Sequence, residues 1–200
     1  MRRIVAIATL FLLSAVAAHA QAASIYVTSS SGHFTNVPTG SVLNSSVYQE
    51  QYTNFWASGI GGGVTLNFLP IGPVKLGFDF RGSTRPGTDG ADTAMAGFRL
   101  GFTPPLIHLK PYVQASGGYV ATRTLNISTN PSNPGQIVGG TFSNKYAAWE
   151  VLGGVDVPIA PILDLRLIEL GGGTGMTVGL SSSQPNISLF TVNSGVVVHF

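Results

Sequence analysis

The sequence contains no cysteine, and charged residues make up only 9% of its 200 residues. Without cysteine, no disulfide framework can stabilise a small exported fold and no lipidated cysteine can anchor the chain. Ordinary soluble domains carry about 25% charged residues. The deficit is typical of membrane proteins.

The longest apolar run lies at the N-terminus, from Ile4 to Ala18, directly after the basic residues Arg2 and Arg3. It is too short to span a bilayer comfortably, since a spanning helix needs about 20 apolar residues. A basic start, an apolar run and the small residues that follow predict a signal peptide over residues 1–20, cleaved after Ala20 or after Ala22. We expect residues 21–200 to form a single domain.

Cleavage would remove two of the ten Lys and Arg residues, which leaves eight, equal to the eight Asp and Glu. The mature chain would then carry no net formal charge. The apparent basicity belongs to the signal peptide and gives no argument for a nucleic-acid partner.

Apolar residues alternate with small or polar ones through most of the mature chain, which predicts β-strands, because successive side chains of a strand point to opposite faces. The clearest case is Val74 to Arg81, in which every second residue is apolar. Near Ile168 and Glu169 the alternation changes parity, which favours a β-bulge. Strands are predicted at about 24–30, 55–68, 74–81, 93–102, 112–122, 147–157, 163–170 and 187–200.

Short turns that contain proline alternate with long polar segments between these strands. The turns are predicted at 69–73, 104–105 and 158–161, and the long loops at 33–53, 82–92, 126–144 and 181–186. Only helices and closed barrels satisfy all their backbone groups in lipid, and the mature chain has no apolar run long enough for a spanning helix. The predicted fold is therefore an all-β, eight-stranded antiparallel up-and-down transmembrane β-barrel.

The final residues Val196, Val198 and Phe200 are apolar at every second position, and the chain stops on the aromatic. Together with the signal peptide and the turn rhythm, this ending resembles the small OmpA-like and OmpX-like bacterial outer-membrane barrels. The segment from Gly153 to Leu170 resembles their penultimate strands and periplasmic turn. The resemblance implies a Gram-negative outer-membrane location, contact with lipid, and a role for Phe200 as the signal read by the barrel assembly machinery. No peptidoglycan-binding domain is expected after the barrel, and we expect a monomer.

Charged residues lie on the parity opposite to the apolar face, so in a barrel they point inward. The interior of an eight-stranded barrel is just wide enough to be filled by side chains. An ion-paired polar core is therefore favoured, and the alternative is a narrow gated pore for small solutes or ions. Glycines on the same parity, such as Gly63 and Gly97, would make room for these long side chains. The predicted interior charge network comprises Lys75, Asp79, Arg81, Arg99, Glu150, Asp156, Asp164, Arg166 and Glu169.

No catalytic, cofactor-binding or metal site is predicted. His33 is expected in the first long loop, on the outer side, but it has no recognisable catalytic spacing. Asp89 and Asp92 supply too few oxygens for Ca²⁺. We therefore predict a non-enzymatic protein with a structural or surface-interaction role, and the loops 33–53 and 126–144 are candidates for contact with an extracellular partner. Two alternatives are kept: a secreted soluble lipocalin-like ligand-binding barrel with the apolar parity inside, and a barrel enzyme that acts on lipid.

Overall fold

The computed structural model describes residues 23–44, 47–105, 107–129, 137–178 and 186–200. The predicted signal peptide and its cleavage sites lie outside these residues. Within them, no helix is long and apolar enough to cross a membrane.

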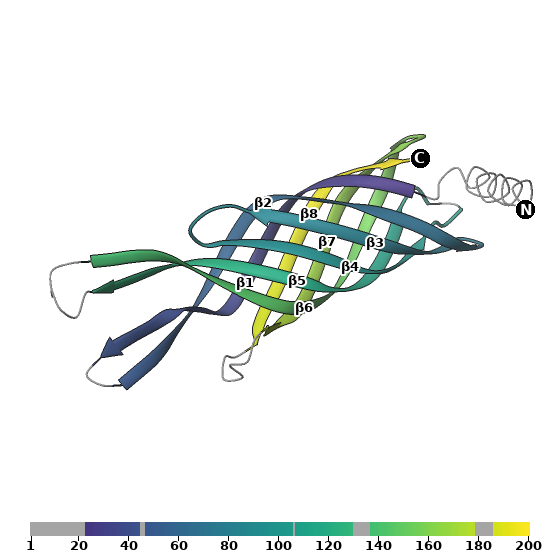
Figure 1. The fold of residues 1–200 in the computed structure, drawn as a ribbon. Helices are drawn as coiled ribbons and strands as arrows, with labels where there is room; N and C mark the ends of the chain where they lie inside the picture. The colour runs from purple at the N-terminus through teal and green to yellow at the C-terminus, as the bar shows by residue number, and fades with distance from the viewer. Residues whose placement is uncertain (1–22, 45–46, 106, 130–136, 179–185) are drawn as a thin grey trace, which may run out of the picture.

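Eight strands form one closed antiparallel barrel in which each strand pairs with its sequence neighbours and β1 pairs with β8 (Figure 1). The predicted eight-stranded up-and-down barrel is confirmed. The strands are β1 (Ala23–Asn44), β2 (Val47–Ile71), β3 (Val74–Arg85), β4 (Gly90–Phe102), β5 (Lys110–Thr129), β6 (Ile137–Ala160), β7 (Leu163–Thr177) and β8 (Ile187–His199).

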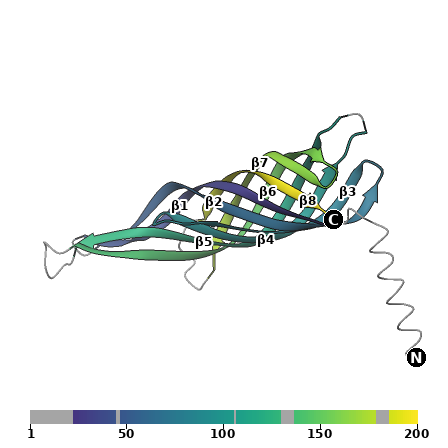
Figure 2. The same cartoon turned by 90° about the horizontal axis from the view of Figure 1, so that it is seen from above.

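The two ends of the barrel differ. At one end lie the tight turns 72–73 and 161–162 and the C-terminus; we call this the turn end. At the other end the β1–β2 and β5–β6 pairs continue past the ring as two long hairpins (Figures 1 and 2). The β1–β8 pairing stops at Thr35, whereas β1 itself runs on to Asn44. We call this the hairpin end.

The predicted long loops 33–53 and 126–144 are wrong, because most of their residues are strand. The register of β1 with β2 extends to Asn44 and Val47, and that of β5 with β6 extends to Thr129 and Ile137. These segments are polar and rich in Ser, Thr, Asn and Gly, so they lack the apolar alternation of a strand with a buried face. Antiparallel pairing needs only the backbone groups. The third predicted loop, 82–92, is likewise shorter, since β3 ends at Arg85 and β4 begins at Gly90.

The two hairpins are tied together at their bases. The carbonyl oxygen of Pro38 in β1 accepts hydrogen bonds from Thr124 Oγ1 of β5, at 3.1 Å, and from Asn144 Nδ2 of β6, at 3.2 Å. Pro38 lies at an irregularity in the register of β1 with β2. Proline in a sheet is found at such positions, where the ladder does not need its missing N–H.

Side chains alternate between the lumen and the outer wall. In β1, Tyr26 is 3% exposed and its neighbour Val27 is 63% exposed. In β7, Leu167 and Ile168 both lie on the outer wall where two residues oppose one residue of β8, and the register shifts between Arg166 and Glu169. The β-bulge predicted there is confirmed, and it turns Glu169 back into the lumen.

The hairpin end of the lumen is filled by apolar side chains. Phe34 and Phe55 stack there with their ring centroids 5.4 Å apart. This apolar plug was not predicted, because the interior was expected to be filled by charged residues. It comprises Phe34, Val37, Phe55, Ala57, Ala91, Met95, Val120, Tyr146, Ala148, Ile187 and Leu189.

Inward-facing glycines lie directly across the ladder from large side chains, as predicted. Tyr26 pairs with Gly63, Tyr112 with Gly154, and Asp79 with Gly97. A Cβ on Gly154 would lie 2.5 Å from the phenol oxygen of Tyr112 and 2.6 Å from its Cζ. The tyrosines therefore cross the lumen over residues that have no side chain.

We expect Gly154→Ala to destabilise the barrel, since the new methyl group must displace the ring of Tyr112. Overpacking of this kind costs about 1–3 kcal/mol. The matched control is Gly153→Ala, because a Cβ there meets nothing closer than the backbone oxygen of Tyr112 at 3.7 Å. Urea unfolding in detergent micelles measures both variants, and equal midpoints for the two would contradict the packing argument.

Candidate functional site

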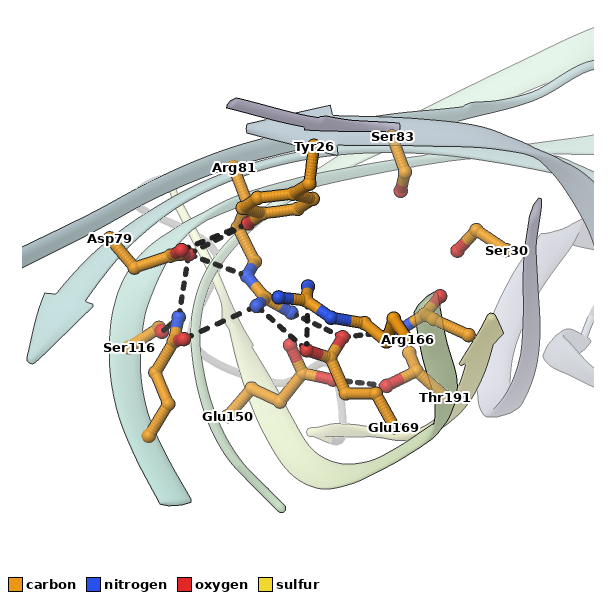
Figure 3. Close-up of polar contacts among 12 residues, drawn as sticks. Tyr26, Ser30, Asp79, Arg81, Ser83, Ser116, Glu150, Arg166, Glu169 and Thr191 are labelled. Carbon is orange, nitrogen blue, oxygen red and sulfur yellow. Dashed lines mark hydrogen bonds and ion pairs between the residues drawn. The ribbon is translucent and has the colours of Figure 1, made fainter. Parts of the chain in front are cut away.

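The polar lumen lies between the apolar plug and the turn end, and it contains all nine residues of the predicted charge network. Six of the nine are buried: Asp79, Glu150, Asp156, Asp164, Arg166 and Glu169. Of the other three, Arg81 and Arg99 are nearly buried, with side chains 11% and 12% exposed, and Lys75 is partly exposed. Figure 3 shows the central part of this network.

Glu169 is the centre of the network. One carboxylate oxygen accepts from Arg81 Nη1 at 2.8 Å, and the other accepts from Arg81 Nη2 at 3.1 Å and from Arg166 Nη1 at 3.2 Å. The Tyr112 hydroxyl and Asn193 Nδ2 donate to the same carboxylate at 2.5 and 2.8 Å. One side chain of β7 is thus bonded to β3, β5 and β8.

Asp79 is held by donors from four strands. Tyr26 of β1 donates to it at 2.9 Å, Thr65 of β2 at 2.8 Å, and Gln114 of β5 at 2.8 Å. From its own strand, Arg81 Nε donates at 2.9 Å. Because Arg81 also bonds Glu169, its guanidinium joins the two acidic centres across the lumen (Figure 3).

Asp156 receives two arginines nearer the turn end. Arg166 Nε donates to it at 2.9 Å and Arg99 Nη2 at 2.7 Å. Both guanidiniums also lie against aromatic faces: the Cζ of Arg99 is 3.5 Å from the ring centroid of Tyr112, and that of Arg166 is 4.3 Å from the centroid of Tyr26. The rings cover cations that could not otherwise be fully hydrogen-bonded.

Asp164 forms a separate cluster at the turn end. Lys110 Nζ donates to its carboxylate at 2.7 Å, and His199 Nε2 lies 2.7 Å from the same oxygen. Lys110 is the most exposed member, so this cluster faces the mouth of the barrel.

Two members of the predicted network have no ion pair among the described residues. Lys75 at the turn end has no carboxylate within salt-bridge distance. Glu150 accepts a short hydrogen bond from the Thr191 hydroxyl but has no cation at that distance. Each of the other seven takes part in at least one ion pair. Arg81–Glu169 and Arg99–Asp156 join strands that are not neighbours.

Sequence reasoning missed the neutral partners and two cations. Tyr26, Tyr112 and Gln114 lie on the inward parity of their strands, so the alternation that placed the charges inside would also have placed them. Lys110 follows the same parity in β5, but it precedes the predicted start of that strand. Arg85 was assigned to a loop, because the polar run after Arg81 carries no apolar alternation.

Buried ion pairs are weak evidence of stability, because the loss of hydration offsets much of the attraction between the charges. The arrangement places three arginines and their carboxylates across one section of the lumen, and the apolar plug lies in the next section. Among the described residues, no group of three or more His, Asp or Glu side chains could hold a metal ion.

The remaining candidate residues lie elsewhere. His33 is part of β1, not of a loop, and its ring stacks on Trp56 with centroids 4.9 Å apart. Asp92 lies in β4 and pairs with Arg123 at 3.1 Å. Phe200 is exposed, and its backbone N–H donates to the carbonyl of Ala23 at 2.9 Å, which continues the β1–β8 seam. Its role in assembly stays a prediction.

Comparison with models of known protein families gives no match, and neither does comparison with curated proteins. Solved structures give coarse likenesses. Neisserial surface protein A is 16% identical with a TM-score of 0.47 over 88% of this chain and 97% of that chain. The N-terminal β-barrel domain of Pseudomonas aeruginosa OprF is 15% identical with a TM-score of 0.46 over 88% and 97%. The outer membrane protein OprG from Pseudomonas aeruginosa is 8% identical with a TM-score of 0.43 over 90% and 97%. Likenesses at this level carry no argument about function, and the fold rests on the strand order and register described above.

We expect Glu169→Gln to destabilise the barrel by about 3–5 kcal/mol, since it leaves the buried cations Arg81 and Arg166 without their shared carboxylate. Asp92→Asn is the matched control. It breaks the Arg123 pair, whose side chains are 33% and 46% exposed, and should cost less than about 1 kcal/mol. Urea unfolding followed by tryptophan fluorescence measures both. A loss for Glu169→Gln no larger than that of the control would show that the network is dispensable.

Proposed function

We propose that this chain is an integral barrel of a bacterial outer membrane with a closed lumen, and that its role is structural or lies in surface interactions at the hairpin end. The observation that carries the membrane assignment is the distribution of side chains. The buried inner face of the lumen holds the carboxylates and arginines, and the outer wall is apolar. This is the reverse of a soluble protein.

The outer wall carries large apolar residues on every strand. They include Val27 of β1, Ile60 of β2, Phe80 of β3, Phe98 of β4, Val113 of β5, Val151 of β6, Leu167 of β7 and Phe190 of β8. A continuous belt of this kind would drive aggregation in water but is the expected surface of a barrel in lipid.

The same distribution argues against a soluble lipocalin-like barrel. That alternative requires the apolar parity inside and the parity of Asp79 in water, whereas Asp79 is fully buried in the lumen. Exposed aromatic residues, such as Phe68 and Phe102 near the turn end and Trp56 and Trp149 further along, also fit the interfacial girdles of a membrane barrel.

A closed lumen favours a structural or surface role over a pore. Ions crossing the barrel would have to separate Arg81 from Glu169 and then pass the stacked rings of Phe34 and Phe55. Both obstacles lie in series. An enzymatic role acting on lipid is less favoured. His33 packs on Trp56 at the outer wall, and the histidine that pairs with a carboxylate, His199 with Asp164, lies at the turn end, away from the hairpins.

The hairpins are the feature that supports a surface role. They extend beyond the ring at the end opposite the C-terminus and are held to each other through Pro38 (Figures 1 and 2). A tie of this kind limits the relative movement of the two hairpin bases, which would lower the entropy lost when a partner binds.

We expect Val151→Lys to reduce assembly of the barrel in membranes, because a lysine on the lipid face near mid-height costs about 2–4 kcal/mol. Ile159→Lys is the control. It lies on the same strand and wall with similar exposure, 57% against 52%, but beside the turn at 161–162, where a lysine can reach water. Heat-modifiable gel mobility of the membrane fraction measures both variants. In a soluble protein, Val151→Lys would replace an apolar residue on the surface with a charged one and would be tolerated. Unimpaired assembly of this variant would therefore contradict the membrane assignment.

We also expect the wild-type protein to be silent in planar lipid bilayers, because the ion-pair layer and the apolar plug block the lumen in succession. The measurement is single-channel recording over a range of voltages. The Phe34→Ala, Phe55→Ala double variant removes the stacked rings and tests whether the charged layer alone is sufficient. Reproducible wild-type conductance steps would favour the pore.

A further inference from the structure

Arg85 is a buried cation that the charge network does not use. It ends β3 on the inner face, beyond Arg81 toward the hairpin end, and is 2% exposed. Its Nη2 donates to Ser30 Oγ at 2.7 Å, and its Cζ lies 5.6 Å from the ring centroid of Phe34. Its Nε and Nη1 are buried and have no hydrogen-bond partner among the described residues.

Glu150 is a carboxylate that likewise takes no part in the ion pairs of the network. It is buried, and it has the Thr191 hydroxyl as a donor but no cation at salt-bridge distance in the described part of the chain. Glu150 and Arg85 lie close together. Thr191, which donates to Glu150, pairs across the ladder with Gly32, and a Cβ on Gly32 would lie 3.2 Å from Arg85 Nε. The opposite charges therefore approach each other without touching.

A small cavity lies between them. It measures about 30 Å³ and is lined by Arg85 and Glu150 together with hydroxyl groups. Its lining also includes Phe34, Met95 and Leu189 of the apolar plug, and Arg81 and Glu169 of the charge network. The hydroxyl-bearing lining residues include Ser30, Ser83, Thr93 and Thr191.

Size and charge together define what can occupy this cavity. A water molecule needs about 10–15 Å³ by this measure and two to four polar partners, so the space fits about two. The charges on its lining balance, because Arg81 is paired with Glu169 and Arg85 faces Glu150. A small anion would leave an excess of negative charge, and a larger solute does not fit.

We propose that this cavity is a hydration site in which ordered water accepts from Arg85 Nε and Nη1 and donates to Glu150, so that the two residues form a water-mediated ion pair. The site joins β3 to β6 at the boundary between the charged network and the apolar plug. The proposal rests on the closed lumen of the proposed function and does not depend on a surface partner.

The first test detects the water directly in the wild-type protein. Arginine side chains labelled with ¹⁵N are observed by NMR in detergent micelles, and Arg85→Lys identifies the Nε–H resonance by its disappearance. We expect a cross-peak between this Nε–H and water, with the sign typical of a long-lived bound molecule. Absence of that cross-peak, or a shift of the resonance on titration with chloride, would overturn the proposal, since the latter would identify an anion in place of water.

The second test measures the coupling between the two residues. Arg85→Gln, Glu150→Gln and the double variant are unfolded in urea. We expect each single change to lower the midpoint by about 1 M and the double change to lower it by clearly less than the sum. The control cycle uses Arg123→Gln and Asp92→Asn, an exposed pair for which we expect effects near zero. Additive losses for Arg85 and Glu150 would overturn the pairing. A single variant that fails to fold while the double variant folds would support it.

The two tests also separate this proposal from the closed-lumen assignment. A conducting wild-type protein that keeps the water cross-peak would contradict the closed lumen and leave the hydration site standing. A silent protein without the cross-peak would do the reverse.

Discussion

The ion pair of Arg81 with Glu169 links β3 to β7 across the lumen, and the rest of the interior is arranged around it. Once a barrel of eight strands closes, its inner face has no route to water except along the axis, so a buried inward charge is costly unless it is paired or hydrogen-bonded. Arg81 meets this demand for two acidic centres at once, because it also bonds Asp79. Neutral donors such as Tyr112 and Gln114 satisfy the oxygens that remain.

Space in the lumen is the second constraint, and the pairing of residues across the ladder satisfies it locally. A large inward side chain lies opposite a glycine, as Tyr26 does with Gly63 and Tyr112 with Gly154. The crossing side chains then lie flat over the facing strand, where their rings cover the arginines. Charge pairing and ring stacking in the lumen are therefore made possible by the residues that contribute no side chain.

Alternation was sufficient to predict the barrel, the inward placement of the nine charges and the bulge that turns Glu169 inward. Those features follow from the parity of a strand with one apolar face. The hairpins beyond Thr35 and Arg123 could not be predicted this way, because their sequence is mostly polar and shows no sustained apolar alternation. Only the backbone pairing marks them as strands. The apolar plug was not predicted because Phe34 and Phe55 are apolar residues on the inner face, where polar side chains were expected. Which carboxylate meets which arginine depends on strand tilt and register across the barrel, and no local pattern carries that information.

The order of layers along the axis limits where a function can reside. Toward the turn end, the Asp164 cluster and Lys75 face the barrel mouth; next come the bonded arginines, then the gap between Arg85 and Glu150, and finally the plug. In the proposed closed lumen, a solute entering from the turn end meets the ion-paired layer before the plug, and one entering from the hairpin end meets the plug first. The lumen, filled by ion-paired and apolar side chains, offers no binding surface to a large molecule. A macromolecular partner must meet the outer wall or the hairpin end, and in the proposed membrane barrel the apolar outer wall faces lipid. The hairpins, tied at Pro38 and extended beyond the ring, are then the part of the described chain best placed to contact a partner.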